Sequence, residues 1–392
     1  MSNNIESNIW KLYIIKALRW FMLIMPIIVL FFQENGLSMK EVFLLQSIFS
    51  IGIILFEIPS GYFSDVIGRK KTIILGCIFG FLGFSIYSFS YGFLGFLIAE
   101  WTLGLGSSFL SGTDSALIYD SLIQVKKEKD YKKIEGRILS IGNFSEAIAS
   151  FLGGFVALIS LRTPFYIETV LIFFTIPLAF TLIEPKRQKY ENRKNPIKEI
   201  IKIVKYSIYH NKKIKWLIFY SGFISASTLT MVWFIQPYFQ FVKLPLAYFG
   251  IAWGILNLSV GIFSLYAHKI ESFFGRKKSL ISLIFISFIG YMLLGIFNSL
   301  WAIGFIILFY FVRGISKPIL KDYINKIISS NMRATVLSVQ NLFGKLIFSI
   351  IGPFIGWITD VYYLQLALLT SGSIFIIFGI ISLFFLHKNK AL

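Results

Sequence analysis

The chain has 392 residues, of which 56% are hydrophobic and only 15% are charged, and its formal net charge is +19. Soluble domains carry about a quarter charged residues, so this composition excludes an ordinary soluble protein and predicts a polytopic membrane protein. The one cysteine, Cys77, excludes an internal disulfide and a cysteine-based zinc site. The three histidines show no metal-ligand spacing, so we expect neither a metal nor a cofactor.

Long apolar stretches recur along the whole chain. A helix needs about 20 mostly apolar residues to cross the hydrocarbon core of a bilayer, and twelve stretches meet this requirement. Because a helix satisfies its backbone hydrogen bonds internally, we predict an all-α fold of twelve transmembrane helices. The predicted spans are 10–33, 41–64, 72–91, 93–122, 137–160, 164–183, 214–240, 247–270, 279–298, 300–324, 334–358 and 364–386.

Basic residues in the connections predict the orientation of the chain. If both termini are cytoplasmic, the outer connections hold only Lys40, Arg162 and Lys243 among the lysines and arginines. The other connections then face inward and are rich in these residues, as the positive-inside rule requires. This rule accounts for the net charge, so we expect no nucleic acid, and contact with anionic lipids instead.

The longest polar segment divides the spans into two groups of six. It covers residues 184–213, between a predicted N-terminal bundle, 1–183, and a predicted C-terminal bundle, 214–392. Isoleucine and valine recur at helical spacing between the lysines of 196–209, so this stretch is predicted to form an amphipathic helix on the inner membrane surface. A simple tether between the bundles is the alternative interpretation.

The two groups of six spans also resemble each other. The sequence GRKKT at 68–72 follows the second span and recurs as GRKKS at 275–279 after the eighth. The sequence LSIGN at 139–143 recurs as LSVQN at 337–341, each time in the fifth span of its group. Two six-helix repeats are typical of secondary transporters, which bind substrate between their halves near the membrane midplane.

The segment GYFSDVIGRKKT at 61–72 combines a carboxylate, two glycines and a basic cluster, and it joins the second and third spans. It closely resembles the signature loop of the major facilitator superfamily, and it departs from that loop at Val66, where the family often has a basic residue. With the partial copy at 275–279, the resemblance extends over the whole chain. It implies two six-helix bundles with cytoplasmic termini, in a protein that ordinarily works as a monomer.

The residues of this loop also have physical roles of their own. Gly61 permits the close approach of another helix, and Gly68 allows a tight turn. Asp65 is placed to bond a helix N-terminus or a cation, and Arg69 is placed to reach Asp120. The resemblance implies that such charges latch one conformation of the transporter. The predicted latch residues in both halves are Gly61, Asp65, Gly68, Arg69, Asp120, Arg137, Arg276, Asp322 and Arg333.

Charged residues inside the spans are costly in a bilayer and are therefore site candidates. In the fourth span Glu100, Ser107, Ser111 and Asp114 are spaced to share one face of a continuous helix. We expect this polar face to line a water-filled cavity. The candidates for coupling to protons or substrate are Glu57, Glu100, Asp114, Glu146, Arg313 and Lys345.

These candidates have structural alternatives. The acids would either exchange protons during transport or form structural ion pairs. Arg313 and Lys345 would either bind an anionic substrate group or pair with Glu146 or Glu57. Lys16 of the first span is expected to extend toward the inner surface.

We expect a secondary transporter of the cytoplasmic membrane that works by alternating access. Proton-coupled efflux of amphipathic or lipophilic small molecules is the preferred hypothesis. Glu100 stands where drug–proton antiporters typically have an arginine, and the fifth span lacks the proline of their glycine–proline motif. Transport of a polar metabolite such as a sugar or organic acid therefore stays open, as does a receptor that no longer transports. No Walker-type phosphate loop is present, and we expect no enzyme activity.

Overall fold

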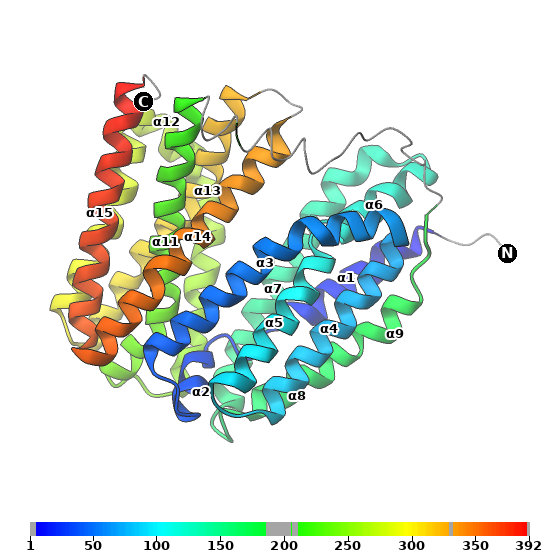
Figure 1. Cartoon of the computed structure of the whole chain (residues 1–392), viewed down its shortest axis with the longest axis horizontal. Coiled ribbons are helices and arrows are strands. Elements are labelled where there is room, and N and C mark those ends of the chain that lie inside the picture. The colour runs from blue at the N-terminus through cyan, green and yellow to red at the C-terminus, as the bar shows by residue number, and fades with distance from the viewer. Residues whose placement is uncertain (1–4, 186–204, 206–210, 329–331, 390–392) are drawn as a thin grey trace. The chain divides into compact units, whose positions relative to one another are not determined.

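The computed structural model describes residues 5–185, 205, 211–328 and 332–389. Every regular element in these ranges is a helix, which confirms the predicted all-α class (Figure 1). The predicted amphipathic helix at 196–209 lies outside the described residues except at position 205.

The helices follow the order of the predicted spans. Among the described residues they are α1 (Ser7–Arg19), α2 (Ile28–Glu34), α3 (Met39–Ile67), α4 (Arg69–Phe89), α5 (Gly92–Leu110), α6 (Thr113–Gln124), η1 (Glu128–Asp130), α7 (Tyr131–Val156), α8 (Thr163–Phe173), α9 (Thr175–Phe180), α11 (Lys212–Phe241), α12 (Ala247–Ile296), η3 (Leu300–Ile306), α13 (Ile307–Ile327), α14 (Arg333–Val361) and α15 (Leu364–Lys388).

The predicted spans and the observed helices differ in how they are divided. Within the described ranges, ten segments are long and apolar enough to cross a membrane. One of them, α12, has 50 residues and contains two predicted spans, separated by a non-helical backbone at Gly275. The first predicted span is not among the ten, because it is split into the short helices α1 and α2. Each of the twelve predicted spans therefore falls on helical structure.

The interruption between α1 and α2 covers residues 20–27, which we call the α1 break. Pro26 lies within it. Proline lacks a backbone N–H, and its ring disfavours a helical conformation in the preceding residue. An interrupted helix inside a membrane leaves backbone groups that other parts of the protein must satisfy.

By their internal contacts the residues form two compact units. Unit 1 comprises Met1–Gly36, Ile48–Asn192 and Leu246–Gly254, and unit 2 comprises Leu37–Ser47, Arg193–Pro245 and Ile255–Leu392. The first turns of α3 thus belong to unit 2 and the rest of that helix to unit 1. The first turns of α12 belong to unit 1 and the rest to unit 2.

Small residues let the helices of unit 1 pack closely. A Cβ atom on Gly106 of α5 would lie 3.0 Å from the carbonyl oxygen of Gly76 on α4, and one on Gly83 of α4 would lie 2.5 Å from Leu103. Such contacts drive helix association in a bilayer, where the hydrophobic effect between helices is absent. Helix α4 also shares a buried cluster with α1, α6, α7 and α9, which includes Leu12, Cys77 and Ile118.

In unit 2 the long helix α11 packs against α13, α14 and α15 (Figure 1). The Trp216 ring of α11 stacks on Phe385 of α15, with ring centroids 4.1 Å apart. A Cβ on Gly222 of α11 would meet Phe343 of α14 at 2.8 Å, so this helix pair is also closely packed. The buried core of unit 2 draws residues from α11 to α15.

The two glycines of the repeated GRKK sequence have the same kind of backbone. Gly68, before the first residue of α4, has φ 116° and ψ 148°. Gly275, inside α12, has φ 74° and ψ 163°. Positive φ values are accessible to glycine at little cost, so the predicted tight turn at Gly68 is confirmed and recurs in the second half.

Arg162, predicted only as an outer-loop residue, closes the end of α4. Its Nη1 donates to the carbonyl oxygens of Ser88 and Ser90, each at 2.9 Å, and its guanidinium lies 4.1 Å from the centre of the Tyr91 ring. The last carbonyls of a helix have no intrahelical donors. Arg162 therefore has a structural role in unit 1.

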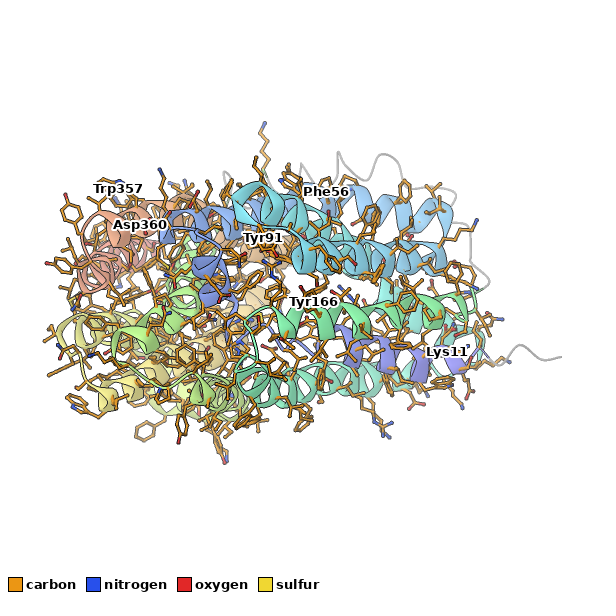
Figure 2. All side chains as sticks on the ribbon, turned by 90° about the horizontal axis from the view of Figure 1, so that it is seen from below. Lys11, Phe56, Tyr91, Tyr166, Trp357 and Asp360 are labelled. Carbon is orange, nitrogen blue, oxygen red and sulfur yellow. The ribbon has the colours of Figure 1, made fainter. Side chains whose placement is uncertain are left out.

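Large apolar and aromatic side chains project outward from the helices of each unit (Figure 2). Tyr91 is 72% exposed and Tyr166 is 43% exposed. Surfaces of this kind are costly in water, whereas aromatic residues are enriched where a membrane protein meets lipid. The surface therefore agrees with a multi-pass membrane protein.

Candidate functional site

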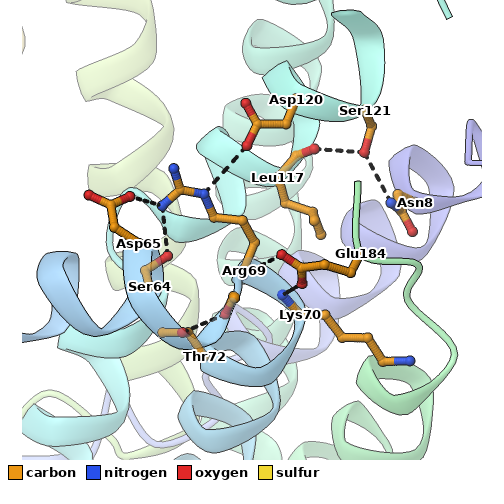
Figure 3. A network of polar contacts seen from close by, with 11 residues as sticks. Asn8, Ser64, Asp65, Arg69, Lys70, Thr72, Leu117, Asp120, Ser121 and Glu184 are labelled. Atoms are coloured by element: carbon orange, nitrogen blue, oxygen red, sulfur yellow. Dashed lines mark hydrogen bonds and ion pairs between the residues drawn. The ribbon is translucent and has the colours of Figure 1, made fainter. Parts of the chain in front are cut away.

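Arg69, the first residue of α4, lies at the centre of a polar network in unit 1 (Figure 3). Its Nη1 is 2.7 Å from Asp65 Oδ1 and 2.9 Å from Ser64 Oγ. Its Nε is 3.5 Å from Asp120 Oδ2. One guanidinium therefore joins the end of α3 to α6, and the predicted approach of Arg69 to Asp120 is present.

A second carboxylate in this network holds the start of α4. Glu184 accepts hydrogen bonds from the backbone N–H groups of Arg69 at 3.0 Å and Lys70 at 2.7 Å (Figure 3). The first N–H groups of a helix have no intrahelical acceptor, and a negative charge there is favourable. Glu184 is the first residue of the predicted polar segment 184–213, so local sequence patterns gave no signal for this contact.

Two predicted latch residues, Gly61 and Arg137, lie outside the network around Arg69. A Cβ atom on Gly61 would meet no atom within 4 Å, so the expected close helix approach at Gly61 is wrong. Arg137 is exposed and forms no ion pair with the described residues. Neighbouring Glu135 instead accepts a hydrogen bond from Ser115 Oγ at 3.1 Å.

The second copy of the motif, in unit 2, is built differently. The Arg276 guanidinium lies 4.2 Å from the centre of the Tyr323 ring, and the Tyr323 hydroxyl donates to Glu271 Oε1 at 2.7 Å. Asp322 pairs with Lys326 at 2.6 Å, so the contact between Arg69 and Asp120 in the first half does not recur between Arg276 and Asp322. Adjacent residues on a helix point about 100° apart, and Tyr323 is the one that faces Arg276.

The side chain of the remaining latch residue in this half, Arg333, lies outside what the structure describes.

The predicted polar face of the fourth span is interrupted. Ser111 ends α5, and Gly112 has a left-handed backbone with φ 74°, after which α6 begins at Thr113. A single continuous stripe from Glu100 to Asp114 is therefore wrong. Glu100 is 4% exposed, whereas Asp114 is half-buried in the first turn of α6, where one of its oxygens accepts the N–H of Ser115.

Asp114 shares a small cavity with two cations of α1. The cavity, of about 10 Å³, is lined by Lys16 and Arg19 from the last turn of α1 and by apolar residues of α1, α5 and α7. This volume suits about one water molecule. The Lys16 ammonium lies 4.3 Å from the centre of the Trp20 ring, one turn deeper along the span, so the expected extension toward the inner surface is wrong.

The remaining coupling candidates are half-buried side chains on four helices. Glu57 of α3 and Glu146 of α7 belong to unit 1, and Arg313 of α13 and Lys345 of α14 belong to unit 2. Neither unit by itself brings these acids and bases together, so their pairing stays a prediction. Among the described residues, no group of three or more histidine, cysteine or acidic side chains is placed to hold a metal.

The sequence model of the Major Facilitator Superfamily matches residues 10–353. The chain belongs to this superfamily. It is 32% identical over 232 residues to an uncharacterized transporter of Buchnera aphidicola, a match that covers 56% of the chain and about half, 54%, of that protein. It is 23% identical over 352 residues to the class H tetracycline resistance protein of Pasteurella multocida, covering 84% of the chain and 83% of that protein.

Solved structures agree with this assignment at the level of the fold. The nucleoside transporter NupG superposes on this chain with a TM-score of 0.81 at 13% identity, covering 98% of this chain and 99% of NupG. This member of the superfamily therefore has an all-α, multi-pass membrane fold.

Asp360 also has a structural contact that the sequence did not predict. It lies near the end of α14, one turn after Trp357 (Figure 2). Its two carboxylate oxygens accept the backbone N–H groups of Met39 and Lys40, each at 2.8 Å, and so cap the start of α3 within unit 2. Gly356 permits this approach, because a Cβ there would lie 2.7 Å from the Met39 carbonyl oxygen.

Glu184→Ala is expected to lower the free energy of unfolding by about 1–2 kcal/mol, because the first N–H groups of α4 lose a charged cap. Unfolding of the purified protein in mixed detergent micelles, followed by circular dichroism, measures this. Glu128→Ala is the control, since Glu128 is exposed in η1 and its side chain forms no ion pair with described residues. Equal stability of the two variants would show that the cap contributes nothing.

Proposed function

We propose that this transporter exports amphipathic or lipophilic small molecules in exchange for protons. The observation that carries the choice of cargo is an apolar cavity of about 180 Å³ in unit 1, between α3 and α5. Aromatic rings bind the apolar faces of ligands and accept varied shapes. The lining residues are Phe56, Pro59, Ser60, Phe63, Leu105, Ser108 and Phe109.

The proposed proton coupling rests on carboxyl groups within the spans. Glu100, Asp114 and Glu146 are buried or half-buried on three different helices of unit 1. Ionisable groups at this depth are costly, and in transporters they often belong to proton pathways. Asp114 lies beside Lys16 and Arg19, so a change in its charge would alter the balance of a cationic cluster. Similarity to a tetracycline resistance protein supports efflux of a drug-like compound.

Proton movement in proteoliposomes tests this proposal. A dye inside the vesicles reports internal pH while tetracycline, lipophilic cations, sugars, nucleosides and organic acids are added one at a time. We expect proton flux with the amphipathic compounds, lowered at least about tenfold by Asp114→Asn or Glu146→Gln. Glu128→Gln is the control, since Glu128 is exposed outside the spans.

The other outcomes distinguish the alternatives. Labelled compound that equilibrates across the membrane without a pH response would replace antiport by uniport. A response to sugars or organic acids alone would replace the proposed cargo by a polar metabolite. Binding without flux of any compound would indicate a receptor and remove transport from the proposal.

A further inference from the structure

Glu168 of α8 is a fully buried acid beside the α1 break. Its exposed fraction is 0%. The Ile24 N–H, from the middle of the break, donates to Glu168 Oε2 at 3.4 Å across 144 residues of sequence. The other oxygen, Oε1, is also buried and has no hydrogen-bond partner among the described residues. Both groups belong to unit 1.

This contact satisfies a backbone group that the break would otherwise leave without an acceptor. The amides of Met25 and Ile27 donate to carbonyl oxygens within the break, at 3.4 and 3.0 Å. Ile24 instead donates to the side chain of Glu168. An unsatisfied N–H in the hydrocarbon region costs several kcal/mol, so the carboxyl group helps to hold the break in its observed conformation.

Among the residues that the structure describes, no cation forms an ion pair with Glu168. The helices that pack against α8 include α4, α9, α1 and α7, and α2, whose Phe31 ring lies against Phe165. Helix α9 carries no ionisable residue, and α2 carries one, the exposed Glu34 at its end. Within the described residues, no ion pair or side-chain hydrogen bond joins Glu168 to an ionisable group of the other four helices. Within or next to the predicted spans, the ionisable residues of these helices are Cys77 and Tyr87 of α4, Lys11, Tyr13, Lys16 and Arg19 of α1, and Glu135, Arg137 and Glu146 of α7.

We propose that Glu168 is a proton-binding site whose occupancy is coupled to the conformation of the α1 break. As the neutral acid, it accepts the Ile24 N–H and buries no charge. When its O–H bond breaks, the proton passes to water admitted at the break. A buried carboxylate is left that has no cation beside it and only backbone N–H groups of the break, at Leu23 and Ile24, as donors among the described residues. Such a carboxylate needs more donors, and the nearest are N–H groups of the break, which must therefore rearrange.

The break connects Glu168 to the cationic cluster. Arg19 is the last residue of α1, and the break follows it directly. Because Arg19 and Lys16 line the same cavity as Asp114, a rearrangement of the break changes how these charges face one another. Interrupted helices at the midplane commonly form the ion and substrate sites of transporters. Proton binding at Glu168 in this way alters the cavity that Lys16 and Arg19 share with Asp114.

The role of Glu168 in transport rests on the proposed function. The inference deepens that function, because it assigns a coupled proton to an acid other than Glu100, Asp114 or Glu146. Proton binding itself requires no substrate. It is therefore tested without one, so that failure of this inference and failure of proton-coupled export give different results.

The test is pH-difference infrared spectroscopy of the full-length protein in proteoliposomes, with no substrate added. We expect the carbonyl band of a buried protonated carboxyl group to disappear as the pH is raised. The band should be lost in Glu168→Gln, which keeps an oxygen to accept the Ile24 N–H but cannot release a proton. It should remain in the matched variants Glu146→Gln and Glu100→Gln. A band that is unchanged in Glu168→Gln would overturn the assignment.

Hydrogen exchange measures the coupling to the break. After correction for intrinsic rates, the exchange of peptides covering residues 20–27 should change severalfold across the same pH range in the wild type. It should be independent of pH in Glu168→Gln. Equal pH dependence in both proteins would show that the break does not respond to Glu168 and would overturn the coupling.

If Glu168→Gln does not fold, the wild-type protein still decides the question. A lipophilic carbodiimide reacts with protonated carboxyl groups in apolar surroundings, and mass spectrometry identifies the modified residue. Modification of Glu168 that declines as the pH is raised supports the proposal. Modification of Glu100 or Glu146 with Glu168 untouched would overturn it.

Discussion

Arg69→Ala is expected to lower the rate of transport at least about tenfold while substrate affinity changes by less than about threefold. The guanidinium bonds Ser64, Asp65 and Asp120. The two ion pairs are partly exposed and contribute about 0.2–1 kcal/mol each, whereas the charged hydrogen bond to the buried Ser64 hydroxyl contributes about 1.5–3 kcal/mol. Because about 1.4 kcal/mol changes an equilibrium constant tenfold, losing these contacts would shift the balance between transporter conformations by at least that much.

Transport rates in proteoliposomes and equilibrium binding of the same labelled compound separate the two effects. Lys71→Ala is the matched control, because it removes a positive charge from the same loop at an exposed position without an ion pair to described residues. Arg69→Lys should be intermediate, since an ammonium cannot reproduce the planar guanidinium fork. Arg69 and Lys71 variants with the same transport rate would refute the proposed latch.

Gly153→Ala is expected to destabilise the protein by about 3 kcal/mol or more and to leave little folded material. A Cβ atom at this position of α7 would lie 2.1 Å from the carbonyl oxygen of Leu23, in the α1 break. The obstacle is backbone, which cannot rotate away, so overpacking here exceeds the usual cost of about 1–3 kcal/mol. The α1 break would have to move, and its contact with Glu168 with it.

Gly136→Ala on the same helix is the control for this substitution. A Cβ on Gly136 meets no atom within 4 Å, so alanine there should be neutral or should stabilise α7 by up to about 1 kcal/mol through its helix propensity. Detergent-solubilised yield and thermal unfolding of the two variants measure the difference. Similar stability of the two would contradict the close packing of α7 on the break.

Sequence patterns predicted those features that depend on neighbouring residues. The all-α class follows from long apolar runs, and the turn at Gly68 follows from a glycine between two spans. Arg69 reaches Asp120 because both lie near the same ends of adjacent spans. Hydropathy, side-chain periodicity and loop charge are local properties, so they can be determined from a single sequence.

The features that the sequence did not predict depend on contacts between distant segments or on single backbone angles. Periodicity assumes an unbroken helix, so it could not show that Gly112 separates Glu100 from Asp114. The cap formed by Glu184 joins residues more than a hundred positions apart. Glu168 could have been named from the sequence, because it is an acid inside the predicted span 164–183 and meets the criterion used for the other acids. Its contact with Ile24 could not, because the two residues are 144 positions apart.

The length of α3 has a mechanical consequence. This helix has 29 residues and is therefore about 43 Å long, and its first turns belong to one compact unit and the rest to the other. Asp360 caps its first turn, while Asp65 in its last turn bonds Arg69. A helix resists compression along its axis, so a displacement imposed at the capped end reaches Asp65 unless α3 bends, and Pro59 is the residue at which bending costs least.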